Sequence, residues 1–320
     1  MTSRNRTALA LAACLLVASI GCTRHGSSAA QASAAAQNRN ASLEPTGNGY
    51  AEAAEGLKVH YEVFGKGDPI VVLAGGFMTI GEMSHVIAPL AQHRQVIGID
   101  LEGHGATGLR TTPMSHQRDG DDVAAVLRHL NIAKADIAGY SHGADAALRM
   151  AIQHPNMVRN LIIASTPAAS DGWYPEVLEG MKRGLRASAA PQMQKTQMYK
   201  DWAAVAPHPE QFSRWVDRMG ALYAKSYDWS DEIRKIQAPT LLLFADHDAV
   251  RTDHIVRFFA LFGGGQHDAG FMPGKIHYAR ARLAIVPGYT HYNFGNGPDM
   301  ARVIESYLEQ PTSPAKPVNE

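Results

Sequence analysis

Residues 136–145 read DIAGYSHGAD, with a serine between Gly139 and Gly143. An apolar run precedes this serine, and a helix-forming run, residues 144–152, follows it. Small residues are required on both sides because the chain turns sharply there from strand to helix and the two pass close together. The Gly-x-Ser-x-Gly pattern therefore predicts a nucleophile elbow, with Ser141 exposed at the carboxyl end of a strand. The backbone N–H of His142 then lies at the start of a helix, where it can stabilise an oxyanion.

The elbow motif alone is weak, because glycine-flanked serines also occur in ordinary turns. Its context strengthens the prediction, since a strand precedes the motif and a helix follows.

The composition limits the classes of partner and substrate. The 320 residues include 30 basic and 30 acidic side chains, so nothing favours a nucleic-acid partner. A neutral or amphiphilic small molecule is the expected substrate.

The N-terminus resembles an export signal. Arg4 and Arg6 precede the apolar run 8–20, which is short for a bilayer span and is followed by a polar tract. Residues 1–22 also resemble a bacterial lipoprotein signal, which implies lipidation of Cys22 and a periplasmic, membrane-anchored protein; simple secretion is the alternative. Ser19 and Ile20 depart from the usual lipoprotein pattern. Cys14 would be removed with the signal, so no intrachain disulfide is expected.

The remaining chain divides by composition. Residues 23–49 are rich in small and polar residues and predict a flexible tether, and residues 310–320 a proline-rich tail. Between them, apolar runs that predict strands alternate with amphipathic helical patterns. The strands are expected at residues 57–64, 70–73, 95–100, 136–139, 161–164, 239–245 and 282–286. This order predicts an α/β fold with a doubly wound, mostly parallel sheet and a site at the carboxyl ends of its strands.

Residues 168–232 interrupt the strand and helix alternation. All four tryptophans lie in this segment, together with several methionines and tyrosines. We expect a helical cap between the two parts of the core, residues 50–167 and 233–309. Some of its aromatic and methionine side chains should form a pocket for an apolar group, while most simply pack the cap on the core.

Three further strand ends carry candidate residues. The loop 74–78 follows a buried strand, and its glycine pair lets backbone N–H groups approach a ligand, so Gly76 is the predicted second oxyanion donor, with Phe77 as the alternative. A tight glycine turn without that role is the simpler explanation. Asp246 and Asp248 follow the strand 239–245, where a carboxylate can orient a histidine. His291 follows the last strand and can reach Ser141.

Together these motifs resemble the α/β-hydrolase family, in its serine-nucleophile, esterase- and lipase-like branch, over about residues 57–308. The matching stretches are the Gly103–Gly105 turn after Asp100, the elbow, residues 245–248 and residues 287–291. The resemblance implies a triad of Ser141, Asp248 and His291, because the second carboxylate of the acid turn is the family's triad member. One departure is Ala74, where many relatives have a histidine before the oxyanion glycine.

The expected activity is hydrolysis of a carboxylic ester through an acyl-enzyme. Alternatives on the same fold are carbon–carbon hydrolase, lactonase, amidase and perhydrolase chemistry, or a non-catalytic binding protein. Phe77, Tyr140, Trp173 and Tyr289 are the predicted pocket residues. No cofactor and no metal is expected, because His247, His267 and His277 show no ligand cluster in sequence.

Overall fold

The computed structural model describes residues 43–270 and 278–310. By its contacts the chain divides into residues 1–44 and Pro45–Glu320, and every helix and strand below belongs to the second unit. The predicted signal, Cys22, residues 23–42 of the predicted tether and residues 311–320 of the tail lie outside the described residues. Within the described part, no helix is long and apolar enough to cross a membrane.

The described strands form one eight-stranded sheet in the order β1-β2-β4-β3-β5-β6-β7-β8. The strands are β1 (Gly47–Glu52), β2 (Lys58–Phe64), β3 (Asp68–Leu73), β4 (Arg94–Ile99), β5 (Ala135–Tyr140), β6 (Val158–Ala164), β7 (Thr240–His247) and β8 (Ala281–Thr290). The β1–β2 and β2–β4 pairs are antiparallel. The six strands β4, β3, β5, β6, β7 and β8, in their order in the sheet, run parallel to one another. The predicted α/β fold with a mostly parallel sheet is confirmed.

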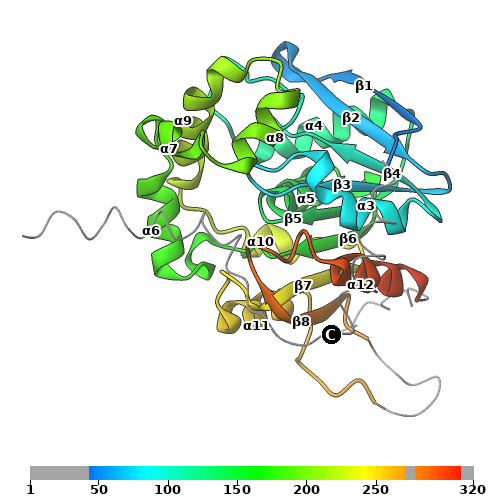
Figure 1. The fold of residues 1–320 in the computed structure, drawn as a ribbon. Coiled ribbons are helices and arrows are strands. Elements are labelled where there is room, and N and C mark those ends of the chain that lie inside the picture. Colours follow the sequence, from blue (N-terminus) through cyan, green and yellow to red (C-terminus); the bar gives the residue numbers. More distant parts are fainter. Residues whose placement is uncertain (1–42, 271–277, 311–320) are drawn as a thin grey trace, which may run out of the picture. The chain divides into compact units, whose positions relative to one another are not determined.

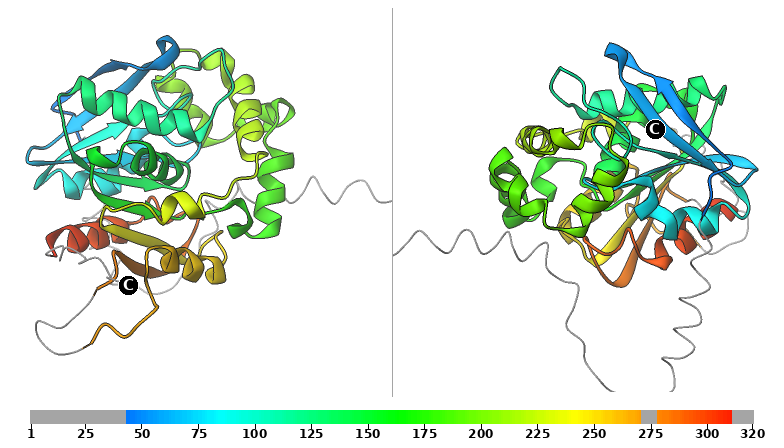
Figure 2. Two further views of the ribbon diagram at one scale, coloured as in Figure 1. Left: turned by 180° about the vertical axis from the view of Figure 1, so that it is seen from behind. Right: turned by 45° about the horizontal axis from the view of Figure 1, so that its top comes forward.

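Helices cover both faces of the sheet and group at one end of it (Figures 1 and 2). They are α3 (Ser84–Leu90), α4 (His116–His129), α5 (His142–Gln153), α6 (Pro175–Gly184), α7 (Ala190–Met193), α8 (Gln197–Val205), α9 (Phe212–Tyr223), α10 (Ser230–Ile233), α11 (Thr252–Leu261) and α12 (Pro298–Glu309). Short 3-10 helices lie at Ala54–Gly56, Ile80–Met83, Pro155–Met157, Ser170–Gly172, Ala187–Ala189 and Pro209–Gln211. Helices α3 and α12 lie on one face of the sheet, and α4, α5 and α11 lie on the other.

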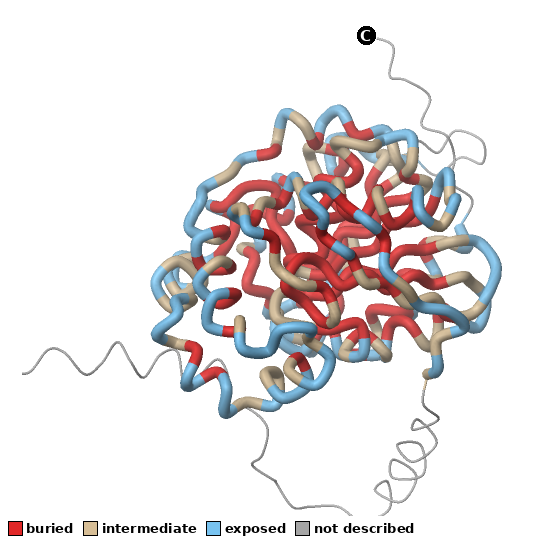
Figure 3. The backbone as a smooth tube through the Cα atoms, turned by 90° about the horizontal axis from the view of Figure 1, so that it is seen from above, coloured by how far each residue is buried: buried red, intermediate tan, exposed pale blue. Residues whose placement is uncertain are grey.

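The core lies along the central strands, as Figure 3 shows by burial. Strand β5 is buried along its whole length, and in β3 the four residues from Ile70 to Leu73 are buried. Val71 lies opposite Ile97 of β4 on one side and Ile137 of β5 on the other. Continuous apolar runs are typical of parallel strands that are covered on both faces. The elbow therefore follows the centre of the sheet.

Strand β1 begins inside the predicted tether. The tether was predicted to end at residue 49, whereas Gly47 already pairs with Val63 of β2. Gly47, Asn48 and Gly49 have low strand propensity, so the sequence gives little sign of a strand here. Strand β2 supplies the hydrogen-bond partners, and this pairing outweighs the low strand propensity of the three residues.

Candidate active site

The nucleophile elbow forms between β5 and α5. Ser141 has φ 52° and ψ −118°, and non-glycine residues rarely adopt a positive φ. Its N–H donates to the carbonyl of Ala164 over 2.8 Å. The flanking glycines are required by close packing: a Cβ on Gly139 would lie 2.1 Å from the Gly143 carbonyl oxygen, and one on Gly143 would lie 2.4 Å from the Leu73 carbonyl oxygen.

Gly139→Ala is expected to lower the free energy of unfolding by about 3 kcal/mol, the upper end of typical overpacking penalties, because the clash is with backbone atoms that cannot rotate away. Gly180→Ala is the matched control. A Cβ at Gly180, inside α6, would meet nothing within 4 Å, so this substitution should stabilise the protein by about 0.5–1 kcal/mol. Urea unfolding of both variants measures the difference. Equal effects would contradict the packing of the elbow described here.

Ser141, His291 and Asp248 converge at the carboxyl edge of the sheet. Ser141 Oγ lies 3.1 Å from His291 Nε2, and His291 Nδ1 lies 2.9 Å from Asp248 Oδ1. His291 follows β8 and Asp248 follows β7, so three separate strands bring the side chains together. All three residues predicted for the triad therefore meet within hydrogen-bonding distance.

Asp248 is buried and held by several donors. Its Oδ2 accepts from Ser165 Oγ over 2.6 Å and from the Ala245 N–H over 3.1 Å, and Oδ1 accepts from the Val250 N–H over 3.3 Å. Burial acts to raise the pKa of Asp248, but the hydrogen bond and charge of His291, together with the hydrogen bonds from Ser165 and the Ala245 N–H, outweigh it, so the pKa lies below its usual value. An ionised carboxylate only accepts, so Nδ1 of His291 is the donor. Neutral His291 therefore presents a bare Nε2, which accepts the Ser141 proton.

Asp246 makes different contacts from those of Asp248. Its Oδ1 accepts from the backbone N–H groups of Gly288 and Tyr289 over 2.9 and 3.2 Å. These contacts fix the end of β8, and the His291 ring bonds to Asp248 instead. Both carboxylates are candidates in the sequence, and in the structure Asp248 is the one that bonds His291.

The loop 74–78 runs beside the start of α5. A Cβ built on Gly76 would lie 3.6 Å from the Cβ of His142, so this predicted donor segment lies next to the elbow. His142 is the first residue of α5, where a backbone N–H has no acceptor within the helix. Phe77 has φ 64°, and Ser165, which bonds Asp248, has φ 57°. Non-glycine residues in this conformation cluster at functional sites.

A pocket of about 90 Å³ lies over Ser141. Its lining consists of Ser141, His142, Asp145, Trp173, Val177, Met181, Tyr223, His291 and Tyr292. Trp173, Val177 and Met181 form an apolar wall from α6 and the segment before it. Asp145 is the one carboxylic acid in this lining; burial raises its pKa to about 7, although a hydrogen bond from Thr166 opposes the change. A charged residue four positions after Ser141, in the first turn of α5, was the available sequence signal and was missed.

Three residues predicted for the pocket are absent from its lining. Phe77 packs against Trp215, with ring centroids 4.8 Å apart. The Tyr140 hydroxyl donates to the His291 carbonyl, and the Tyr289 hydroxyl donates to Asp299 over 2.6 Å. Trp173 alone of the four predicted residues lies in the pocket. The other three hold the loops of the site in place.

The predicted cap segment is helical, and its aromatic residues mostly pack among themselves. Trp202 stacks on Trp215 with centroids 5.0 Å apart, and Trp202 Nε1 donates to the Gly103 carbonyl over 2.8 Å. Trp229 belongs to the main core. Of the four tryptophans, only Trp173 lines the pocket.

Histidines gather behind the elbow, where the sequence predicted no ligand cluster. His116, Asp119 and His142 place one potential ligand atom each within 4.8 Å of one another. Burial lowers the pKa of His116 to about 3 and that of His142 well below its usual value, and it raises the pKa of Asp119 well above the ordinary range. His104 stacks on His142 at 5.2 Å and bonds the Glu102 carbonyl through Nδ1. His116, Asp119 and His142 are not among the candidate ligands considered in the sequence analysis, and the packing of α4 against α5 brings them together.

Comparison with known proteins agrees with this geometry. Residues 68–208 match the alpha/beta hydrolase fold family. The chain has the α/β-hydrolase fold. Over 225 residues it is 26% identical to a 2-hydroxymuconate semialdehyde hydrolase of Pseudomonas sp., across 62% of this chain and 76% of that relative. Over 264 residues it is 23% identical to a pimeloyl-(acyl-carrier protein) methyl ester esterase of Nitrosospira multiformis, across 76% and 95% of the two chains.

Solved structures share this fold. Carboxylesterase CesB of Bacillus subtilis matches with a TM-score of 0.63 at 18% identity, covering 88% of this chain and 96% of that one. The names of the two sequence relatives give different substrates, a methyl ester in one and a semialdehyde in the other. The comparisons therefore show an α/β-hydrolase fold, with esterases and other hydrolases among the similar proteins.

Proposed function

We propose that this protein cleaves a carboxylic ester through an acyl-enzyme formed on Ser141. The observation that carries the proposal is the continuous relay from Ser141 Oγ to His291 Nε2 at 3.1 Å and from His291 Nδ1 to Asp248 at 2.9 Å. A serine hydroxyl is a weak nucleophile until an adjacent base takes its proton. Here the base is present, and its second nitrogen is held by an ionised carboxylate.

The residues then divide the work as follows. Ser141 attacks the ester carbonyl while His291 takes its proton, and Asp248 stabilises the resulting imidazolium. The same imidazolium protonates the leaving alcohol. His291 next takes a proton from water, which attacks the acyl-enzyme and releases the acid.

The tetrahedral oxyanion is proposed to bind backbone N–H groups. The N–H of His142 is one donor, as the sequence predicted. For the second donor, Gly76 and Phe77 both lie in the adjoining loop, and the positive φ of Phe77 favours it, because strained backbone at a functional site points to a functional constraint.

The pocket suggests the kind of substrate. Trp173, Val177 and Met181 offer an apolar surface to one side of the ester, whereas Asp145 and Tyr223 offer polar atoms. We infer a small, uncharged substrate whose apolar part packs against α6.

Covalent labelling tests the proposal. A fluorophosphonate probe should add one equivalent to the wild-type chain, and peptide mapping should find it on Ser141. His291→Gln keeps the serine but removes its base, so labelling should slow strongly. If the serine of the folded wild-type protein resists the probe, a non-catalytic binding protein becomes the better account.

A substrate panel separates the chemistries that share a serine triad. Short and long acyl esters, lactones, amides and a vinylogous diketone should be assayed under the same conditions. The proposal expects the highest kcat/KM on an ester. A clear preference for the diketone would instead assign carbon–carbon bond hydrolysis.

Export is a separate part of the proposal and depends on residues 1–22. We infer that the chain is exported and anchored through a lipid on Cys22. Fractionation of a bacterium expressing the full chain is expected to place wild type in the membrane fraction and Cys22→Ser in a different fraction. Equal distribution of the two proteins would rule out the lipid anchor.

A further inference from the structure

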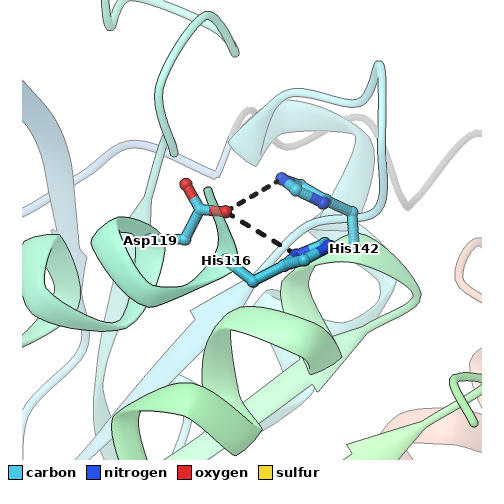
Figure 4. A group of neighbouring side chains, drawn as sticks. All are labelled: His116, Asp119 and His142. Carbon is cyan, nitrogen blue, oxygen red and sulfur yellow. Dashed lines mark ion pairs between the residues drawn. The ribbon is translucent and has the colours of Figure 1, made fainter. Parts of the chain in front are cut away.

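Behind the elbow lies a group of three buried polar side chains that have no hydrogen-bond partners for the atoms facing one another. His116 and Asp119 come from the first turn of α4, and His142 begins α5 (Figure 4). Asp119 Oδ2 lies 3.6 Å from His142 Nε2 and 4.0 Å from His116 Nδ1. His116 is 6% exposed, His142 1% and Asp119 0%. The contacts are too long for hydrogen bonds, so Asp119 Oδ1 and Oδ2, His116 Nδ1 and both nitrogens of His142 are left unpaired.

Unpaired groups of this kind are rare, because burying a polar atom without a partner is unfavourable. A buried carboxylate is the most costly member of the group. Five unpaired atoms on three adjacent side chains therefore indicate an additional occupant that bonds to them.

The surrounding charges indicate that this occupant is positive. Two buried cations act on the group, Arg110 on Asp119 and Arg149 on His116, but both are already paired. Arg110 pairs with Glu102 over 2.8 Å and with Asp122 over 2.5 Å, and Arg149 pairs with Glu232 over 2.9 Å. Among the described residues, neither a lysine nor an arginine forms an ion pair with Asp119. The carboxylate of Asp145 lies 3.8 Å from His116 Nδ1 and adds to the acidic character. A water molecule is the alternative occupant, and it differs from a cation in that it would not stabilise the ionised form of Asp119.

We propose that His116, Asp119 and His142 bind one divalent metal ion of the zinc type. Two imidazoles and one carboxylate are a common ligand set for zinc. Ligands at 2.0–2.1 Å in a tetrahedral site lie about 3.4 Å apart. The two distances to Asp119 Oδ2 are 3.6 and 4.0 Å, and all three ligand atoms lie within 4.8 Å of one another, so metal binding requires the side chains to move inward, by up to about 1 Å for the widest pair. The ligand atoms are His116 Nδ1, Asp119 Oδ2 and His142 Nε2.

The position of the ion gives it a positioning role rather than a catalytic one. His142 contributes its side chain to the metal, while its backbone N–H lies beside Ser141. The ion would tie the first turn of α4 to the first turn of α5 and hold the elbow from behind. The inference concerns metal binding and is independent of which bond the enzyme cleaves.

Metal analysis of the full chain, expressed without a histidine tag, tests the proposal. Wild-type protein loaded with zinc and then desalted should retain about one ion per chain at this site. Asp119→Asn and His116→Gln should each lose that equivalent, since removal of a direct ligand is expected to weaken binding by more than the about 10–100-fold seen for outer partners. His254→Gln is the matched control, because His254 is also buried, at 5% exposure, and lies away from the group. It should keep the zinc.

A second measurement remains decisive if a variant fails to fold. Wild type stripped by a chelator should regain thermal stability when zinc is added, by about 5 °C at a hundredfold excess over Kd. Cobalt in place of zinc should give the visible absorption of a four-coordinate site. Asp119→Asn, which removes a buried charge, should fold and show neither response.

Several results would overturn the proposal. Equal zinc content in wild type and Asp119→Asn would place the ion elsewhere, for example on surface histidines. An unchanged melting temperature on zinc addition would do the same. A high-resolution structure of the zinc-loaded protein that shows a water molecule, or a direct Asp119–His142 hydrogen bond, would exclude the site.

Discussion

Ser141→Ala is expected to lower kcat on a model ester by about a million-fold, the scale seen when a serine triad is dismantled. The loss is this large because the serine, the imidazole and the carboxylate act as one unit, and without the hydroxyl no acyl-enzyme can form. Steady-state hydrolysis of a p-nitrophenyl ester, with the enzyme concentration fixed by absorbance, measures the effect.

The matched control for this variant is Ser213→Ala. Ser213 is an exposed serine of α9 whose hydroxyl lies 3.4 Å from the Ala187 carbonyl. Its removal should leave kcat and the unfolding curve close to wild type. Thermal unfolding of Ser141→Ala should also be close to wild type, so that lost turnover is not lost folding. A turnover near the wild-type value in Ser141→Ala would remove the serine from the mechanism.

Asp248→Asn is expected to lower kcat by about 10⁴-fold, and Asp246→Asn by less than about 10-fold. The difference follows from the donors around each carboxylate. Oδ2 of Asp248 faces two donors, Ser165 and the Ala245 N–H, so the amide NH₂ of an asparagine would turn away from them and toward His291. His291 Nδ1 would then have to accept, its proton would move to Nε2, and Ser141 would lose its base.

At Asp246 the substitution is tolerated. Its Oδ1 accepts from the backbone N–H groups of Gly288 and Tyr289 and lies 3.1 Å from Nδ1 of the exposed His247. The carbonyl oxygen of an asparagine can accept from the same donors. Parallel kcat measurements on both variants, together with their melting temperatures, give the ranking. The opposite ranking would assign the carboxylate role to Asp246 and contradict the relay.

Much of the fold was predictable because each parallel strand is a continuous apolar run. The runs at 70–73 and 161–164 lie within β3 and β6, and strands followed by helices imply a parallel sheet. Strand β8 was predicted only to residue 286 and reaches Thr290, since Pro287 in the sequence argues against a strand. An edge strand tolerates proline because one side of it needs no partner.

The polar contents of the site were harder to predict. Ser141, Asp248 and His291 could be found because each follows a strand, and strand ends meet at one edge. His116, Asp119 and His142 come instead from the first turns of two helices, and their approach depends on how α4 packs against α5. The spacing of these residues in the sequence does not predict how the two helices pack. The pocket residues were missed for a related reason, since Val177 and Met181 reach Ser141 only through the placement of α6.

Phe77, Ser141 and Ser165 share one feature with a practical consequence: each is a non-glycine residue with positive φ at the end of a central strand. Such conformations cost on the order of 1–3 kcal/mol each. A substitution that relieves this strain should raise the thermal stability of the protein but lower its turnover, because the strained residues shape the site. A laboratory evolution screen that rewards only survival at high temperature is expected to accumulate glycines at Phe77 and Ser165. The variants that it recovers should have a higher melting temperature and a lower kcat than the wild type.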